Sequence, residues 1–255
     1  MREILESTRL PNGLVVLSDR MQGLRSATLG FFYSVGSRNE PDELNGISHF
    51  IEHTVFKGTN RRSPLDIAIE MDRLGGSLEA FTTHEETGFI AKVIDEQVAD
   101  AFDLIADMLT DPLFDEEELK AERRVILEEI KMTEDSPEEL LGEIFTRKFF
   151  PDHPLGLSIA GTPKTVRSFD SKVTRRYHRR MYTPDNLIIA AAGNIDHSSI
   201  VALAEKYFGE TPGATQKRNT RTRKPSYAAP VVIKRNVNLE QAQMIIATPF
   251  VSAAD

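Results

Sequence analysis

Two histidines and a glutamate within one short predicted helix constrain this chain more than any other feature of its sequence. His49-Phe50-Ile51-Glu52-His53 has the pattern H-x-x-E-H, and it lies in a stretch, 45–56, whose apolar residues recur at helical spacing. Residues four apart on an α-helix differ by about 40° around its axis, so His49 and His53 share one face. Glu52 projects from an adjacent part of that face. The three polar side chains therefore gather on one side of the helix.

This combination of side chains predicts a metal site. Two imidazoles suit zinc, and a nearby carboxylate can take a proton from a water molecule that the metal activates. With 6 histidines in 255 residues, the pattern is expected by chance only roughly 0.01 times. The alternative is a pair of surface histidines, but half of the neighbouring positions are apolar. Because the chain has no cysteine, a thiolate metal site, a cysteine nucleophile and a disulfide scaffold are excluded.

A third ligand has to come from another element, because a catalytic zinc ion takes three protein ligands and keeps one position open for water. The helix predicted after Asp115 offers Glu122, Glu128 and Glu129. Glu122 and Glu129 are seven residues apart and lie nearly on one face, within a partly apolar stripe where an unpaired acid is expensive. The alternative is a solvated acidic face. Periodicity alone does not choose between Glu128 and Glu129.

The rest of the chain mixes strand and helix patterns, which favours the α+β class. The Asn12-Gly13 pair predicts a hairpin turn between two apolar stretches. Ser63 followed by Pro64 predicts a helix start, and the Gly75-Gly76 pair predicts its end. Further strands are expected at 26–35, 78–81, 88–93 and 187–192, and further helices at 98–109, 116–132, from 137, 170–182 and 197–208.

The length and composition are those of a globular protein that has more residues than one typical domain. At roughly 150 residues per domain, the length corresponds to about 1.7 domains. Residues 1–210 are expected to form one complete domain, 211–229 a polar and basic linker, and 230–255, with strands at 231–233 and 244–246, the opening of a second domain. No apolar stretch approaches the roughly eighteen residues of a membrane span. The net charge of −8 argues against generic nucleic-acid binding.

Six segments of the chain carry a specific resemblance. They are LPNGLVVLSD, GSRNEPDELNGISHFIEHTVFKGT, GGSLEAFTTHEETGF, AERRVILEEIKM, DHPLGLSIAGT and YTPDNLIIAAAGNID. Together they closely resemble the pitrilysin/insulinase-type zinc metallopeptidases, the inverzincins, and especially their bacterial and mitochondrial processing-peptidase branch. The resemblance covers about residues 8–210, and it implies a mixed or antiparallel sheet packed against helices.

The resemblance also implies a full set of site residues. The family's third zinc ligand is a glutamate roughly 76 residues after the second histidine, and Glu129 stands at that distance from His53. It thus implies one Zn²⁺ held by His49, His53 and Glu129. Glu122 matches an additional acid that orients a zinc-binding imidazole, and Glu52 matches the general base of peptide hydrolysis.

The segment Glu79-Ala80-Phe81-Thr82 matches the family's substrate strand, an edge to which an extended peptide adds by backbone hydrogen bonds. The family commonly has asparagine where this chain has Glu79, so the side-chain contact to substrate departs from the pattern. The alternative is a plain strand. The following run, 84–86, is interpreted as a polar turn, because adjacent residues on a strand point to opposite faces.

The family usually joins two similar halves that close over the peptide, and the segment 240–243 resembles the opening strand of the second half. The resemblance therefore implies peptide substrates, including presequence-like segments, and a second homologous half as partner. A truncated chain, a split enzyme and a dimerising half-size homologue are the alternatives, and the end inside a predicted strand favours truncation. A non-catalytic, partner-dependent subunit is the alternative function, and a zinc hydrolase of small molecules is disfavoured by the strand match. The absence of a presequence favours a bacterial cytoplasm.

Overall fold

A six-stranded mixed sheet is the centre of the fold in the computed structural model, which describes residues 5–213, 225–229 and 242–251. The strand order is β1-β2-β6-β3-β5-β4. Neighbouring strands are antiparallel except β2 and β6, which are parallel. The strands are β1 (Leu5–Arg9), β2 (Val15–Arg20), β3 (Ser26–Tyr33), β4 (Ser77–Thr82), β5 (Thr87–Ile94) and β6 (Leu187–Gly193). The predicted α+β class with a mixed sheet is confirmed.

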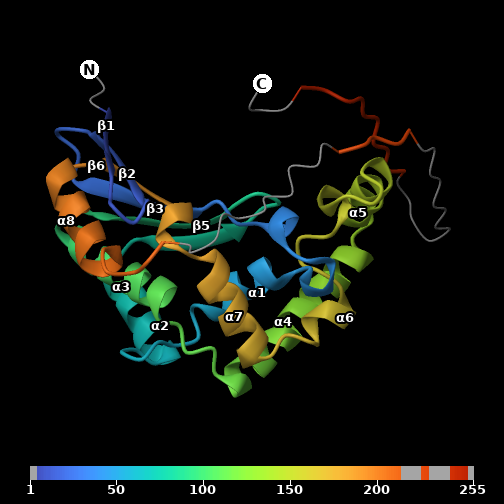
Figure 1. Ribbon diagram of the computed structural model, residues 1–255, viewed down its shortest axis with the longest axis horizontal. Helices are drawn as coiled ribbons and strands as arrows, with labels where there is room; N and C mark the ends of the chain where they lie inside the picture. Colours follow the sequence, from blue (N-terminus) through green and yellow to red (C-terminus); the bar gives the residue numbers. More distant parts are fainter. Residues whose placement is uncertain (1–4, 214–224, 230–241, 252–255) are drawn as a thin grey trace.

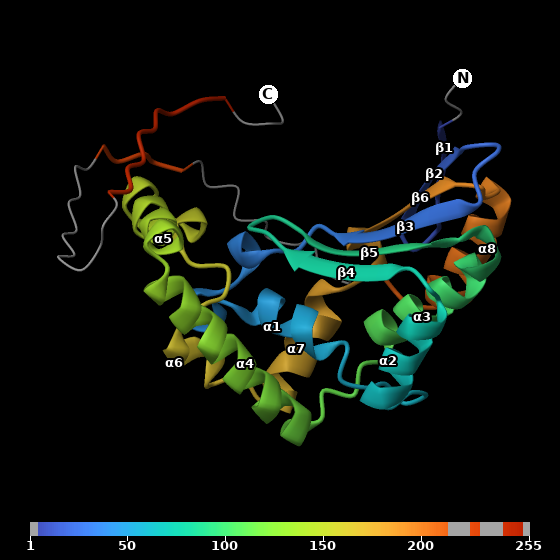
Figure 2. The ribbon, with the colours of Figure 1, turned by 180° about the vertical axis from the view of Figure 1, so that it is seen from behind.

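The helices gather on one side of the sheet, as Figures 1 and 2 show from opposite directions. The helix α1, which carries the histidines, lies beneath β4 and β5, and the long α4 crosses below it. The helices are α1 (Ile47–Thr54), α2 (Pro64–Arg73), α3 (Val98–Thr110), α4 (Glu116–Asp135), α5 (Pro137–Phe149), α6 (Pro163–Val166), α7 (Ser171–Met181) and α8 (His197–Phe208). None of the described helices is long and apolar enough to cross a membrane.

The core lies between the sheet and these helices. Along β3, Leu29, Phe31 and Tyr33 are buried, because alternate residues of a strand face the same side. Phe31 packs edge-on against Phe102 of α3, with their ring centroids 5.0 Å apart. Complete burial of one such side chain is worth about 1.5–3 kcal/mol. The sheet and helices are therefore held together mainly by this apolar layer.

The predicted elements are found close to their expected places, with two differences of length. The helix expected at 45–56 is the shorter α1, because Gly46 has φ of +96° at its N-cap and the residues before it form 3₁₀ turns. The short helix expected from Pro137 is the 13-residue α5. Within the loop expected at 151–163, the structure forms a 3₁₀ turn at Pro154–Gly156 and begins α6 at Pro163.

The strand expected at 244–246 is wrong. The described residues 242–251 form neither helix nor strand, and Met244 and Ile246 are 79% and 83% exposed. A strand needs a neighbour to satisfy its backbone N–H and C=O groups, and no strand of the described chain pairs with this segment. The strand expected at 231–233 lies outside the described residues. In the expected linker, Tyr227 packs against Phe149 and Phe150 at the end of α5.

Candidate metal centre

The helix α1 presents two different faces to its surroundings. Phe50, Ile51 and Thr54 are completely buried and fix the helix against the core, and Phe50 packs on Phe169. His49 and His53 stand on another face, with side chains 18% and 19% exposed and ring centroids 4.7 Å apart. The helical spacing thus places both imidazoles side by side at the edge of the core.

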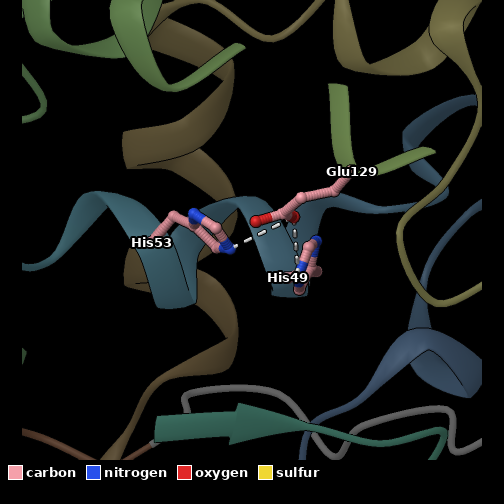
Figure 3. A group of neighbouring side chains, drawn as sticks. All are labelled: His49, His53 and Glu129. Atoms are coloured by element: carbon pink, nitrogen blue, oxygen red, sulfur yellow. Dashed lines mark ion pairs between the residues drawn. The ribbon is translucent and has the colours of Figure 1, made fainter. Parts of the chain in front are cut away.

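The third member of the group comes from α4. The Oε2 atom of Glu129 lies 3.8 Å from His49 Nε2 and 3.7 Å from His53 Nε2 (Figure 3). The candidate ligand atoms of the three residues lie within 4.8 Å of one another. Ligand atoms of a tetrahedral zinc site stand roughly 3.4 Å apart, since each lies about 2.1 Å from the metal. Two imidazole nitrogens and one carboxylate oxygen therefore fit zinc in chemistry and nearly in spacing.

The structure distinguishes the two neighbouring glutamates that periodicity left open. Glu128 points into solvent, with its side chain 70% exposed and its carboxylate 3.4 Å from Lys131. Glu129 faces α1 instead. Only Glu129 of this pair is placed to share a metal with the histidines.

Glu122 lies behind His53, one side chain further from the candidate metal position than the three candidate ligands. Its Oε2 atom is 3.2 Å from His53 Nδ1, and its Oε1 atom is 2.7 Å from the ammonium of Lys57. Burial opposes the charge of Glu122, but the bonds to His53 and Lys57 outweigh it and lower its pKa. A carboxylate in this position orients the imidazole and leaves Nε2 of His53 free to face Glu129.

The surroundings shift the pKa values of the two histidines in opposite directions. Burial, assisted by the charge of His53, lowers the pKa of His49 to about 4, so its imidazole is neutral at neutral pH. Burial also opposes the charge of His53, but the bond to Glu122 and the charges of Glu129 and Glu52 raise its pKa overall. Metal ligation requires neutral imidazole, so a metal ion at this position would compete with protonation of His53.

Glu52 lies beside these residues and is held by the strand β4. Thr82 Oγ1 on β4 donates a hydrogen bond of 2.7 Å to Glu52 Oε2. Burial raises the pKa of Glu52, and this effect exceeds the opposing effect of the bond from Thr82. A carboxylate with a raised pKa and a fixed orientation has the properties of a general base.

A cavity of about 460 Å³ opens next to this group, between β4, α4, α5 and the segment 158–163. His49, Glu52, Phe81 and Thr82 line it. Glu79 and Ala80 do not: Glu79 is exposed further along the strand, and Ala80 pairs with Phe89 of β5. β4 is an edge strand of the sheet, as the match to a substrate strand requires.

Sequence reasoning missed Glu40, which contacts the start of the helix that carries the two histidines. Glu40 is 1% exposed, and its carboxylate accepts hydrogen bonds from the backbone N–H groups of Gly46 and Ser48. A glycine N-cap, which has no side chain to cap the helix, follows an acidic residue at a distance of six. This combination is the only signal in the sequence that indicates the contact.

The fold and this group of residues define a class of metallopeptidase. A family model described as Insulinase (Peptidase family M16) matches residues 15–163, and one described as Peptidase M16 inactive domain matches residues 168–255. The chain therefore belongs to the insulinase family of zinc proteases, and the resemblance inferred from its motifs is confirmed.

Individual relatives are bacterial. An uncharacterized zinc protease of Streptomyces coelicolor is 39% identical over 253 residues, which are 97% of this chain and 55% of that protein. One of Bacillus subtilis is 43% identical over 198 residues, 78% of this chain and 48% of that protein. A protease from Helicobacter pylori superposes with a TM-score of 0.83 at 26% identity, over 88% of this chain and 55% of that one. The first half of the periplasmic protease PqqL from Escherichia coli shares the fold, with a TM-score of 0.75 at 21% identity, over 84% and 48% of the two chains. This chain spans about half the length of the curated relatives it matches.

Proposed function

We propose that this chain is the catalytic, zinc-binding half of an endopeptidase that hydrolyses extended peptides, including presequence-like segments. The observation that carries the proposal is the convergence of His49, His53 and Glu129 beside a cavity that Glu52 also lines. The relatives named as zinc proteases support it. A bound zinc ion supplies Lewis acidity, which acidifies a coordinated water molecule and polarises a peptide carbonyl.

The chain's own residues would do the rest of the chemistry. His49, His53 and Glu129 would hold one zinc ion, and Glu122 would orient the imidazole of His53. Glu52, held by Thr82, would take the proton of the attacking water and pass it to the leaving amine. Burial raises its pKa, which makes it a better proton acceptor than an ordinary carboxylate.

The open edge of β4 supports recognition of the peptide as an added strand. An extended peptide along Glu79–Thr82 would bond to the backbone there, and its scissile bond would lie near Phe81 and Thr82, which line the cavity. Recognition through the backbone is independent of side-chain identity. We therefore expect the conformation of the substrate to matter more than its sequence.

A second candidate function follows from the length of the chain. Because it spans about half of its relatives, a second homologous half is the partner we propose, either in a longer chain or as a separate subunit. Without that half, the chain would be an inactive subunit that binds zinc.

The relatives support a bacterial source, and the cytoplasm is the compartment we propose.

The test compares wild type with Glu52→Gln, and with Glu128→Gln as a matched control on the exposed side of α4. Zinc content is measured by atomic absorption, and peptide cleavage is measured for the chain alone and with the second half of a relative supplied. We expect one zinc ion per chain in all three proteins, and a kcat for Glu52→Gln that is lower by about 10²–10⁴-fold. Absence of stoichiometric zinc in wild type, or full activity of Glu52→Gln, would contradict the proposal. Zinc binding without cleavage under either condition would select the second candidate.

A further inference from the structure

The two imidazoles of the candidate metal centre are held in different ways. Nδ1 of His53 is fixed by the carboxylate of Glu122. Nδ1 of His49 is buried and has no hydrogen-bond partner among the residues that the structure describes. The position of the His49 imidazole therefore depends on the helix turn that carries it and on packing against the ring of His53, because no described side chain bonds to its Nδ1.

That turn is the first turn of α1, and it does not cap itself. Its N-cap residue, Gly46, provides no side-chain hydrogen bond. The cap comes instead from Glu40: Oε2 accepts the N–H of Gly46 at 2.7 Å, and Oε1 accepts the N–H of Ser48 at 2.8 Å. Both groups belong to the N–H donors that a helix start leaves without intrahelical partners. Ser48 directly precedes His49.

The same carboxylate is connected to the wall of the cavity. The side-chain amide of Asn45 donates to Glu40 Oε2 at 3.3 Å and to the carbonyl of Ser158 at 2.8 Å. Gly46 packs so closely on the segment 158–163 that a Cβ atom there would lie 2.7 Å from the carbonyl oxygen of Ala160. Glu40 thus joins the start of α1 to a segment that lines the cavity.

Burial of the Glu40 carboxyl group costs free energy. Glu40 is fully buried, and burial raises the pKa of its carboxyl to about 7. The N–H groups it accepts from and the positive end of the helix dipole offset part of the desolvation. An apolar residue would avoid that desolvation but leave the N–H groups of Gly46 and Ser48 without this acceptor, so the carboxylate serves the helix start and not packing alone.

We propose that Glu40 is a positioning residue of the metal centre, whose carboxylate fixes the first turn of α1 and through it the imidazole of His49. This inference rests on the proposed zinc site. It assigns to Glu40 the support for His49 that Glu122 provides for His53. The difference is that Glu40 acts on the helix backbone instead of on the imidazole ring.

The test measures metal binding by Glu40→Gln, which keeps the size of the side chain but removes its charge and one acceptor. Asp66→Asn is the matched control, since Asp66 accepts the N–H of Ser63 at the start of α2, which supplies no candidate ligand. Zinc affinity is measured by competition with a chromophoric chelator, and site geometry by the visible spectrum of bound Co²⁺. We expect Glu40→Gln to bind zinc roughly 10–100-fold more weakly, with an altered cobalt spectrum, and Asp66→Asn to match wild type in both.

Asn45→Ala is a second variant, which keeps Glu40 but removes the amide that donates to Glu40 and to the carbonyl of Ser158. We expect Asn45→Ala to weaken zinc binding as well, but less than Glu40→Gln does. If Glu40→Gln does not fold, Asn45→Ala alone provides the test. Wild-type zinc affinity and an unchanged cobalt spectrum in the folded variant would overturn the role of Glu40. Failure of wild type itself to bind zinc would instead overturn the proposed function, so the two failures are distinguishable.

Discussion

Lys57, three residues beyond the end of α1, reaches the same carboxylate as His53. Its ammonium lies 2.7 Å from Glu122 Oε1, while His53 contacts the other oxygen of that carboxylate. A carboxylate held on both oxygens has little freedom to rotate. The contacts of Lys57 with Glu122 and of Glu122 with His53 therefore control where Nε2 of His53 points. Lys57 lies one side chain further from the candidate metal position than Glu122 does.

Replacement of Lys57 by methionine keeps the length of the side chain and removes its charge. Glu122 then loses one of its two partners, and we expect zinc affinity to fall by up to about 10-fold, the lower limit for loss of a group that supports a ligand. Lys131→Met is the control, since Lys131 pairs with the exposed Glu128 among the described residues. Equal zinc affinities of the two variants in a competition titration would show that His53 alone is sufficient to fix Glu122.

The residues of the site were predictable from sequence to different degrees. His49, Glu52 and His53 lie within one helix turn and a half, so helical geometry alone places them together. Glu129 is 76 residues from His53, and only the family resemblance separated it from Glu128, because both lie on the same helix. Glu40 was missed because it binds backbone N–H groups, which every residue but proline has and which leave no side-chain pattern.

At the scale of elements, helix α7 shows how a polar side chain can be accommodated in the core. His178 stacks on Tyr182 and meets Phe114 edge-on, and its Nε2–H donates to the carbonyl of Leu109 at 3.0 Å. Burial lowers its pKa to about 4. The neutral ring thus secures α7 against α3, and its protonated form is disfavoured in the folded protein.

This contact makes stability depend on pH in a defined window. In the unfolded chain the pKa of a histidine is about 6.5, so between pH 6.5 and 4 the unfolded state binds a proton that the folded state does not. The contribution of His178 to stability is complete above pH 6.5 and is lost as the pH falls toward 4. We expect urea unfolding of wild type to lose about 2 kcal/mol more between pH 7 and pH 5 than His178→Gln, which keeps a donor for Leu109. Parallel pH profiles of the two proteins would contradict this assignment.

Most elements could be placed from sequence because their ends carry local signals. Ser63, Asp115 and Asp170 accept backbone N–H groups at the starts of α2, α4 and α7, as their residue types indicate. The strand order could not be derived, because pairing between distant strands has no local signal. The strand expected at 244–246 is wrong for a related reason. The composition of this segment suits a strand, but a strand also needs a partner strand.

At the scale of the whole molecule, the candidate ligands join parts of the chain that are far apart. The histidines come from α1 and Glu129 from α4, and the intervening chain includes α2, β4, β5 and α3. A metal ion bound by all three residues would stabilise the folded state only, because the unfolded chain does not bring them together. Zinc is therefore expected to act on the stability of the domain as well as on its chemistry.

Removing the metal with a chelator tests this effect on the stability of the domain. At a zinc concentration of 100 times Kd, binding adds about 2.7 kcal/mol to the free energy of unfolding. For a domain of this size we expect a chelator to lower Tm by roughly 5–10 °C, and added zinc to restore it. His53→Ala should show no response to the chelator. An equal shift in wild type and His53→Ala would locate the stabilising metal elsewhere.

The position of β6 has a consequence for the order in which the protein is built. Among the described strands, β6 is the last in the chain, yet it lies between β2 and β3 and pairs with both. Until Leu187–Gly193 leaves the ribosome, the β1–β2 hairpin and the β3–β5–β4 unit have no strand to join them, and each keeps an unpaired edge. The synthesis of the residues between β5 and β6 takes roughly 5–20 s at about 5–20 residues per second. During that interval the edges of β2 and β3, which β6 later covers, are open to any other unfolded chain nearby, so this is the stage at which a chaperone would protect it most.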